Sequence, residues 1–94
     1  MKVVWSPTAE RNADAIWEYI AQDDIDAADR IRAALDAAAE RLAIHPRMGR
    51  SGRARKTREL IVAGTPYLLI YRVSPKKVEI ARVLHGRQDW PPKG

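Results

Sequence analysis

The chain has 94 residues, of which 46% are hydrophobic and 31% charged, and it contains no cysteine. A chain of this length is expected to form one domain, 1–94, with a single modest core. The lack of cysteine excludes disulfides and thiolate metal sites. Because no apolar run approaches the roughly 20 residues that span a bilayer, we expect a cytoplasmic protein that does not associate with a membrane.

The formal net charge of +5 is unevenly distributed along the chain. Residues 1–46 carry five basic and nine acidic side chains, whereas residues 47–94 carry twelve basic and three acidic ones. Six of the basic residues fall between Arg47 and Arg58. A solvated basic surface is one interpretation, but this clustering favours a C-terminal half that faces an anionic partner, either nucleic acid or an acidic protein segment.

The first half of the chain predicts a short strand followed by two helices. Residues 2–5 form the strand, after which Ser6 can cap a helix and Pro7 suits its first position. Apolar residues at helical spacing extend this helix to about Ala21, and a second stripe predicts a helix over 25–44. The short acidic connection between them indicates an antiparallel helical hairpin.

The second half predicts a basic loop and then three strands, at 58–63, 67–73 and 78–84, joined by short turns. Such turns indicate an antiparallel meander. The fold class is therefore α+β, with a helical hairpin packed on a small, mainly antiparallel sheet in the order β-α-α-β-β-β. The residues expected to be buried between hairpin and sheet are Trp17, Ile31, Leu35, Leu60, Leu69 and Tyr71.

Motifs for metal or nucleotide chemistry are missing from the sequence. The two histidines, His45 and His85, lack carboxylate partners at ligand spacing. The glycine-containing stretch 49–52 lacks the lysine and threonine spacing of a phosphate-binding loop. We therefore expect neither a metal nor a cofactor.

A metal-free ribonuclease remains chemically possible, because it needs only proton carriers and cations around the scissile phosphate. The candidate proton carriers are His85, Glu59, Tyr67 and Tyr71, and the candidate cations are Arg58, Arg72, Arg82 and Arg87. The two tyrosines alternate with apolar residues, so strand periodicity favours a core role for them. Trp90 is interpreted as an aromatic plug over the core edge, with base stacking as the alternative.

Several segments, taken together and in order, resemble toxins of the RelE/ParE superfamily. They are Val4-Trp5-Ser6-Pro7, Ile16-Trp17-Glu18-Tyr19-Ile20, Ala27-Ala28-Asp29-Arg30, His45-Pro46-Arg47-Met48-Gly49-Arg50, Thr57-Arg58-Glu59-Leu60, Pro66-Tyr67, Tyr71-Arg72-Val73, Val83-Leu84-His85-Gly86-Arg87 and Trp90-Pro91. Each segment is weak evidence alone, but the set covers nearly the whole chain. The resemblance implies a bacterial toxin held inactive by a cognate antitoxin, either ParD-like or RelB-like.

The superfamily divides by mechanism, and two positions make this chain more similar to its ParE branch. RelE-type members cleave mRNA on the ribosome, whereas ParE-type members poison DNA gyrase. The nucleases usually carry an arginine where this chain has Leu68, and they carry a tyrosine, or a His-Tyr pair, near the C-terminus, in the region where this chain has Trp90. His85 and Arg87 agree with the nuclease pattern better than Leu68 and Trp90 do, so a nuclease is kept as the alternative interpretation.

Three functional classes are therefore weighed: a gyrase inhibitor, a ribosome-dependent mRNA endoribonuclease, and a plain nucleic-acid-binding module. The third would require aromatic residues within the basic run, which has none. For a gyrase inhibitor, the expected recognition surface is Arg58, His85, Arg87 and Trp90. For a nuclease, the expected catalytic set is His85, Arg87 and Arg58.

Overall fold

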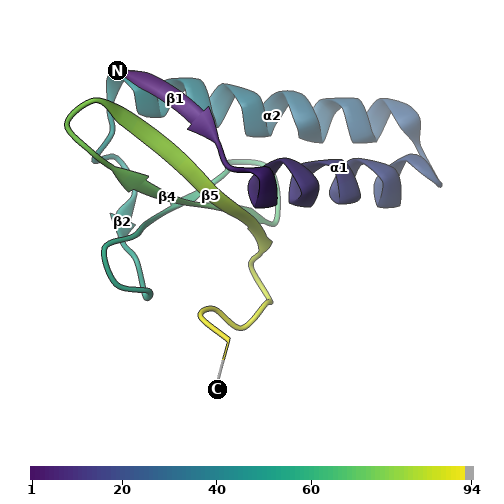
Figure 1. The fold of residues 1–94 in the computed structure, drawn as a ribbon. Coiled ribbons are helices and arrows are strands. Elements are labelled where there is room, and N and C mark those ends of the chain that lie inside the picture. Colours follow the sequence, from purple (N-terminus) through teal and green to yellow (C-terminus); the bar gives the residue numbers. More distant parts are fainter. Residues whose placement is uncertain (93–94) are drawn as a thin grey trace.

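A helical hairpin covers one face of a five-stranded sheet in the computed structural model, which describes residues 1–92 (Figure 1). The elements in chain order are β1 (Lys2–Trp5), α1 (Pro7–Ala21), α2 (Ile25–Ile44), β2 (Arg50–Ser51), β3 (Arg58–Ile61), β4 (Tyr67–Val73) and β5 (Lys77–His85). The predicted α+β class and the predicted order are confirmed. The sequence did not reveal β2, because two residues carry no periodicity.

Both helices begin with side-chain caps. Ser6 Oγ accepts a hydrogen bond from the amide of Ala9 at 3.0 Å, and Asp24 Oδ1 accepts one from the amide of Ala27 at 3.0 Å. The hydroxyl of Ser6 also donates to the carbonyl of Ala81 at 2.8 Å. Each cap satisfies a backbone donor that the first helical turn leaves free, and the Ser6 cap also ties α1 to β5.

The strand order in the sheet is β1-β5-β4-β3-β2. β1 runs parallel to β5, while the other neighbouring pairs are antiparallel. The meander strand predicted at 58–63 ends at Ile61, where a tight turn follows with Thr65 N–H donating to the Val62 carbonyl at 3.1 Å. The last strand is longer than predicted, and the β4–β5 register shifts between Ile70 and Tyr71.

The main core lies between the hairpin and the sheet. Leu35, Leu69 and Tyr71 are fully buried there as predicted, and Ile31 and Leu60 pack against them while half-buried. The prediction for Trp17 was wrong: it is half-exposed, and its indole N–H donates to Asp29 Oδ1 at 2.9 Å. Trp17 therefore joins α1 to α2 at the surface of the hairpin instead of filling the core, because a polar partner for its N–H lies there.

The helical hairpin projects beyond the edge of the sheet, so its tip is not supported by strands (Figure 1). Two large apolar side chains near this tip, Tyr19 and Ile25, are 73% and 59% exposed. The opposite face of the sheet carries no helix in the part of the chain that the structure describes. We call this uncovered side the open face.

Candidate functional site

The residues expected to form one recognition surface are distributed over two faces and two ends of the sheet. Arg58 pairs with Tyr71 across β3 and β4, and His85 pairs with Tyr67 across β4 and β5. Paired residues point to the same side of a sheet, and both tyrosines belong to the helix-side core. Arg58 and His85 therefore lie on the helix side, but their partners stand at opposite ends of β4, about 13 Å apart along the strand.

His85 and Arg87 form a compact corner at the end of β5. The amide of Arg87 donates to His85 Nδ1 at 3.1 Å, and the amide of His85 donates to Gln88 Oε1 at 2.7 Å. The His85 ring also meets Tyr67 edge to face, with the ring centroids 5.6 Å apart. These contacts occupy Nδ1 and fix the ring, which leaves Nε2 as the imidazole atom able to contact a partner.

Trp90 lies on the open face, where it covers a small second core. It packs against Leu68, Ile70 and Leu84, and the guanidinium carbon of Arg82 stands 5.1 Å from the centre of its ring. The interpretation of Trp90 as an aromatic plug is confirmed. Within residues 1–92 its buried indole N–H has no hydrogen-bond partner.

A shallow groove of about 260 Å³ runs beside Trp90 across the open face. Thr57, Arg72, Glu79 and Arg82 are among its lining residues. Arg72 and Glu79 approach each other to 3.9 Å, which is a loose and partly exposed ion pair. Glu79 is the acidic residue among the described residues that line the groove.

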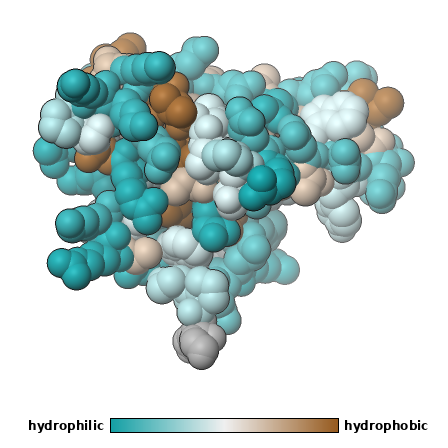
Figure 2. All heavy atoms as spheres, viewed as in Figure 1, coloured by the Kyte–Doolittle hydropathy of each residue, from teal (hydrophilic) through white to brown (hydrophobic). Residues whose placement is uncertain are grey.

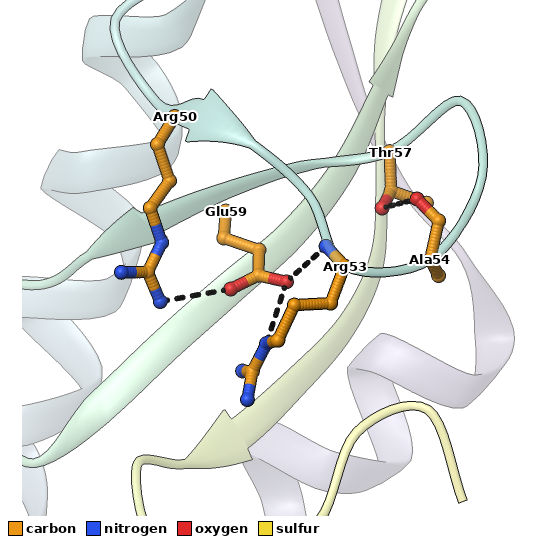
Figure 3. A network of polar contacts seen from close by, with 5 residues as sticks. All are labelled: Arg50, Arg53, Ala54, Thr57 and Glu59. Carbon is orange, nitrogen blue, oxygen red and sulfur yellow. Dashed lines mark hydrogen bonds and ion pairs between the residues drawn. The ribbon is translucent and has the colours of Figure 1, made fainter.

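The basic loop between α2 and β3 is organised around the carboxylate of Glu59 (Figure 3). Arg50 Nη2 donates to Oε1 at 3.0 Å, while the amide and Nε of Arg53 donate to Oε2 at 2.9 and 3.2 Å. The side chain of Glu59 is fully buried, whereas the side chains of Arg50 and Arg53 remain about half-exposed. A candidate proton carrier is thus a structural anchor that draws two cations onto the open face of the sheet.

The electrostatics of Glu59 agree with this role. Burial by itself raises the pKa of the carboxyl, but the hydrogen bonds from the Arg53 amide, the Arg53 side chain and Arg50 lower it, and the net pKa lies below the ordinary value of 4.5. The carboxylate therefore stays ionised at neutral pH and serves as an acceptor. The sequence offered one signal for this arrangement, namely a single acidic residue directly after a run of six cations.

Tyr71 supports the start of the same loop from the core. Its buried hydroxyl accepts the amide N–H of Gly49 at 2.9 Å, and the carbonyl of Gly49 accepts Arg58 Nη1 at 2.7 Å. A side chain at position 49 would place its Cβ 2.7 Å from the Tyr71 hydroxyl and 2.7 Å from the Glu59 carbonyl, so only glycine fits. Burial raises the pKa of Tyr71 and also that of Tyr67, which keeps both phenols protonated.

The loop itself lines a polar pocket of about 500 Å³. Arg47, Arg55, Lys56 and Arg58 are its charged lining residues, and we call this site the basic pocket. Figure 2 shows hydrophilic residues gathered on the side of the molecule that carries β2 and this loop. Arg58, expected on one surface with His85, belongs instead to this pocket.

An apolar hollow lies next to the basic pocket, at the end of α2. Ile44, Pro46 and Met48 line it together with His45 and Arg47, and its volume is about 520 Å³. Ile44 is 74% exposed, the largest exposed fraction among the large hydrophobic side chains that the structure describes. We call this site the apolar hollow.

Two other features, a metal-binding cluster and a membrane-spanning helix, are lacking in residues 1–92. No group of three or more histidine, cysteine or acidic side chains is placed to hold a metal ion there. No helix in this range is long and apolar enough to cross a membrane.

The family model and the relatives that match this chain agree in describing toxins. The model of the ParE toxin of the type II toxin–antitoxin system parDE matches residues 3–90. The candidate toxin Y4kP of Sinorhizobium fredii is 44% identical over 96% of this chain and 93% of its own length. Toxin RelE2 of Caulobacter vibrioides is 39% identical over 90% of this chain and 94% of its own length.

Solved structures show the same fold. A chain of the chromosomal ParDE system of Pseudomonas aeruginosa superposes with a TM-score of 0.80 at 22% identity, covering 90% of this chain and 95% of that one. A chain of the RelBE2 toxin–antitoxin complex of Mycobacterium tuberculosis gives 0.68 at 29% identity, covering 89% and 95%. With its family model, its relatives and its fold in agreement, the chain belongs to the ParE toxin family of the RelE/ParE superfamily and is the toxin of a type II toxin–antitoxin system.

Proposed function

We propose that this toxin arrests growth by binding and inhibiting DNA gyrase in the bacterial cytoplasm, and that a cognate antitoxin neutralises it. The observation that carries the proposal is the placement of the proton carriers. Glu59 is locked between two arginines, and Tyr67 and Tyr71 are buried with raised pKa values. Cleavage of RNA without a metal needs a proton carrier within hydrogen-bond reach of the reacting oxygen, and these three are committed to packing or to the loop.

The open-face groove supports the same proposal. Arg72 and Arg82 could stabilise a negatively charged phosphate there, but the histidine and the tyrosines considered as proton carriers face the other side of the sheet. A cationic groove without an acid–base pair is suited to binding and not to bond breaking. Inhibition of a partner enzyme requires binding alone.

We infer that recognition of gyrase involves two separate regions. One is the end of β5 and the segment that follows it, which carry His85, Arg87 and Trp90; the other contains Arg58 and the basic pocket. Exposed cations of this kind mainly raise the rate of association with an acidic or nucleic-acid-bound partner. Arg58→Ala combined with Arg87→Ala is therefore expected to weaken toxicity by acting on both regions.

The second candidate is a ribosome-dependent mRNA endoribonuclease. It is favoured by Nε2 of His85, which is not used by the contacts that fix the ring, and by the adjoining Arg87. In this alternative His85 transfers the proton, and Arg87 and Arg58 contact the phosphate. The relative named RelE2 and the RelBE2 structure keep this alternative open at the level of the family.

The experiment that separates the two compares His85→Ala with His45→Ala. His45 is the other histidine of the chain, it is exposed, and it lies at the end of α2, so it is a matched control. Growth arrest, plasmid supercoiling by purified gyrase and ribosome-dependent mRNA cleavage are measured for both variants and for the unmodified toxin. We expect inhibited supercoiling, no mRNA cleavage, and most of the toxicity retained in both variants.

Loss of mRNA cleavage in His85→Ala, but not in His45→Ala, would contradict the gyrase proposal. Suppose that His85→Ala folds and binds its antitoxin, but cleaves mRNA about 10²–10⁴-fold more slowly than the unmodified toxin, while His45→Ala keeps the full cleavage rate. The gyrase proposal is then wrong. The nuclease alternative then stands with His85 as its acid or base.

A further inference from the structure

We propose that the basic pocket binds the sugar–phosphate backbone of duplex DNA. The inference deepens the proposed function, on which it rests for its role at gyrase, since gyrase works on duplex DNA. It names a second component of the target: the toxin would contact the DNA held by the enzyme as well as the enzyme. The pocket and its four cations, Arg47, Arg55, Lys56 and Arg58, carry the argument.

The charge of the basic pocket is not compensated locally. From Arg47 to Arg58 the sequence has six cations and no acidic residue. Among the residues that the structure describes, no carboxylate lines the pocket. The nearest acid along the chain, Glu59, has both oxygens occupied by Arg50 and Arg53. Uncompensated cations gathered in one concave site attract a polyanion and release its counterions on binding.

The backbone of the loop is fixed before any ligand arrives. The amide of Gly52 donates to the Thr57 carbonyl at 2.7 Å, and the hydroxyl of Thr57 donates to the Ala54 carbonyl at 2.6 Å. Lys56 adopts a φ of 60°, a left-handed conformation uncommon for a residue with a side chain. A turn held in this way loses little further entropy when it binds, and it keeps Arg55 and Lys56 at the tip.

The basic surface continues past the pocket. Lys56 also lines an adjoining depression with Arg72, Ser74 and Lys77, where Glu79 is the single acidic lining residue in the described part of the chain. The cations thus follow one another along one end of the sheet. A row of this kind fits the regular spacing of phosphates along a duplex better than a single bound anion.

Other anionic partners fit the basic pocket less well. Single-stranded nucleic acid is held by aromatic side chains on which bases stack, and the described lining contains none. A peptide segment needs apolar anchoring. Among the described residues that line the pocket, the apolar side chains are Ala54 and Val73, whereas the neighbouring apolar hollow offers Ile44, Pro46 and Met48. Backbone contacts to duplex DNA need cations alone.

The test measures binding of the full chain, without gyrase, to a fluorescent duplex as a function of salt. Four phosphate contacts predict a slope of log affinity against log salt of about −3.6, which is a loss of roughly 10²-fold between 50 and 200 mM salt. The variant Arg55→Gln with Lys56→Asn removes two contacts, and asparagine tolerates the left-handed backbone. We expect its slope to fall to about −1.8.

The matched control removes the same charge from the helical hairpin, by Arg11→Gln with Arg30→Gln, both of which are exposed. Its slope should equal that of the unmodified chain. Thermal denaturation of each variant checks that it is folded. An unchanged slope in the loop variant, an equal loss in the control, or tighter binding of single-stranded RNA or of an acidic peptide than of duplex would overturn the proposal.

A parallel supercoiling assay keeps this inference distinct from the proposed function. If the chain binds duplex as described but does not inhibit gyrase, the gyrase proposal fails and the DNA site stands. If the chain inhibits gyrase but its duplex binding fails the salt test, the DNA site is wrong and the gyrase proposal stands.

Discussion

Glu59 Oε2 accepts hydrogen bonds from both the backbone amide and the side-chain Nε of Arg53, at 2.9 and 3.2 Å. One carboxylate oxygen thereby fixes the main chain of the basic loop and the direction of one of its cations. The other oxygen binds Arg50 at 3.0 Å. The loop depends on a buried acid for its shape, which leads to the first prediction.

Replacing this carboxylate should destabilise the protein. Glu59→Gln keeps the volume but turns one charged acceptor into an amide that cannot accept from all three donors, at an expected cost of about 1–3 kcal/mol. Thermal unfolding should shift down by about 4–8 °C for each kcal/mol. The control is Glu79→Gln, since Glu79 meets Arg72 only at 3.9 Å and is partly exposed, so its effect should stay within about 0.5 kcal/mol. Equal shifts in the two variants would contradict the role of Glu59.

The same group predicts a pH dependence of stability. The pKa of Glu59 in the folded protein is lower than its ordinary value of 4.5. A group with a lowered folded pKa contributes stability above its unfolded pKa, and this contribution is lost as the pH falls through the folded pKa. The difference in unfolding free energy between the unmodified chain and Glu59→Gln should be constant above about pH 5.5 and shrink below about pH 4.5. Urea unfolding at several pH values measures it, and a difference that grows on acidification would be contrary to the assignment.

Removal of one buried hydroxyl should loosen the start of the loop. Tyr71→Phe leaves the amide of Gly49 without its acceptor, and a buried donor without a partner costs about 1–3 kcal/mol. Hydrogen exchange of the Gly49 amide should accelerate accordingly. Tyr19→Phe is the control because Tyr19 is 73% exposed, and it should leave both stability and exchange unchanged. Protection of Gly49 that survives Tyr71→Phe would mean that another group holds this amide.

The core between hairpin and sheet gives a further stability test. Leu35 and Leu69 are both fully buried, so truncating either to alanine should cost about 2–5 kcal/mol. Ile25→Ala removes a comparable side chain that is 59% exposed at the hairpin tip, and surface changes of this kind stay within about 0.5 kcal/mol. Denaturant titration measures all three. A midpoint for Leu35→Ala equal to that of Ile25→Ala would contradict the packing described for α2.

The antitoxin is expected to use the apolar hollow. Its opening combines the exposed Ile44 with Arg47, so a segment with an apolar anchor and acidic neighbours would complement it. Ile44→Ser should weaken antitoxin binding at least tenfold by calorimetry, through loss of a buried anchor. Ile25→Ser, at the acidic hairpin tip, should leave the affinity unchanged. The idea would be abandoned if both variants bound the antitoxin as tightly as the unmodified toxin.

The sequence predicted the elements of the fold well because the helical stripes and strand alternation are strong and regular. It predicted the site less well. His85, Arg87 and Trp90 are close in sequence, but the chain passes from the helix side to the open face between His85 and Trp90. Periodicity assigns faces within a strand and cannot follow an irregular segment. The role of Glu59 depends on three donors from a loop without periodicity, and hence required the structure.

The parallel pairing of β1 with β5 has a consequence for the newly made chain. Ser6, which caps α1, donates to the carbonyl of Ala81, 75 positions further along. The first strand therefore has no edge to join until nearly the whole polypeptide has left the ribosome, and contacts so distant in sequence form slowly. The hairpin can become helical earlier, but the sheet that covers its apolar stripe is complete only when the final strand arrives. A truncated product that lacks β5 is therefore expected neither to complete the fold nor to be toxic.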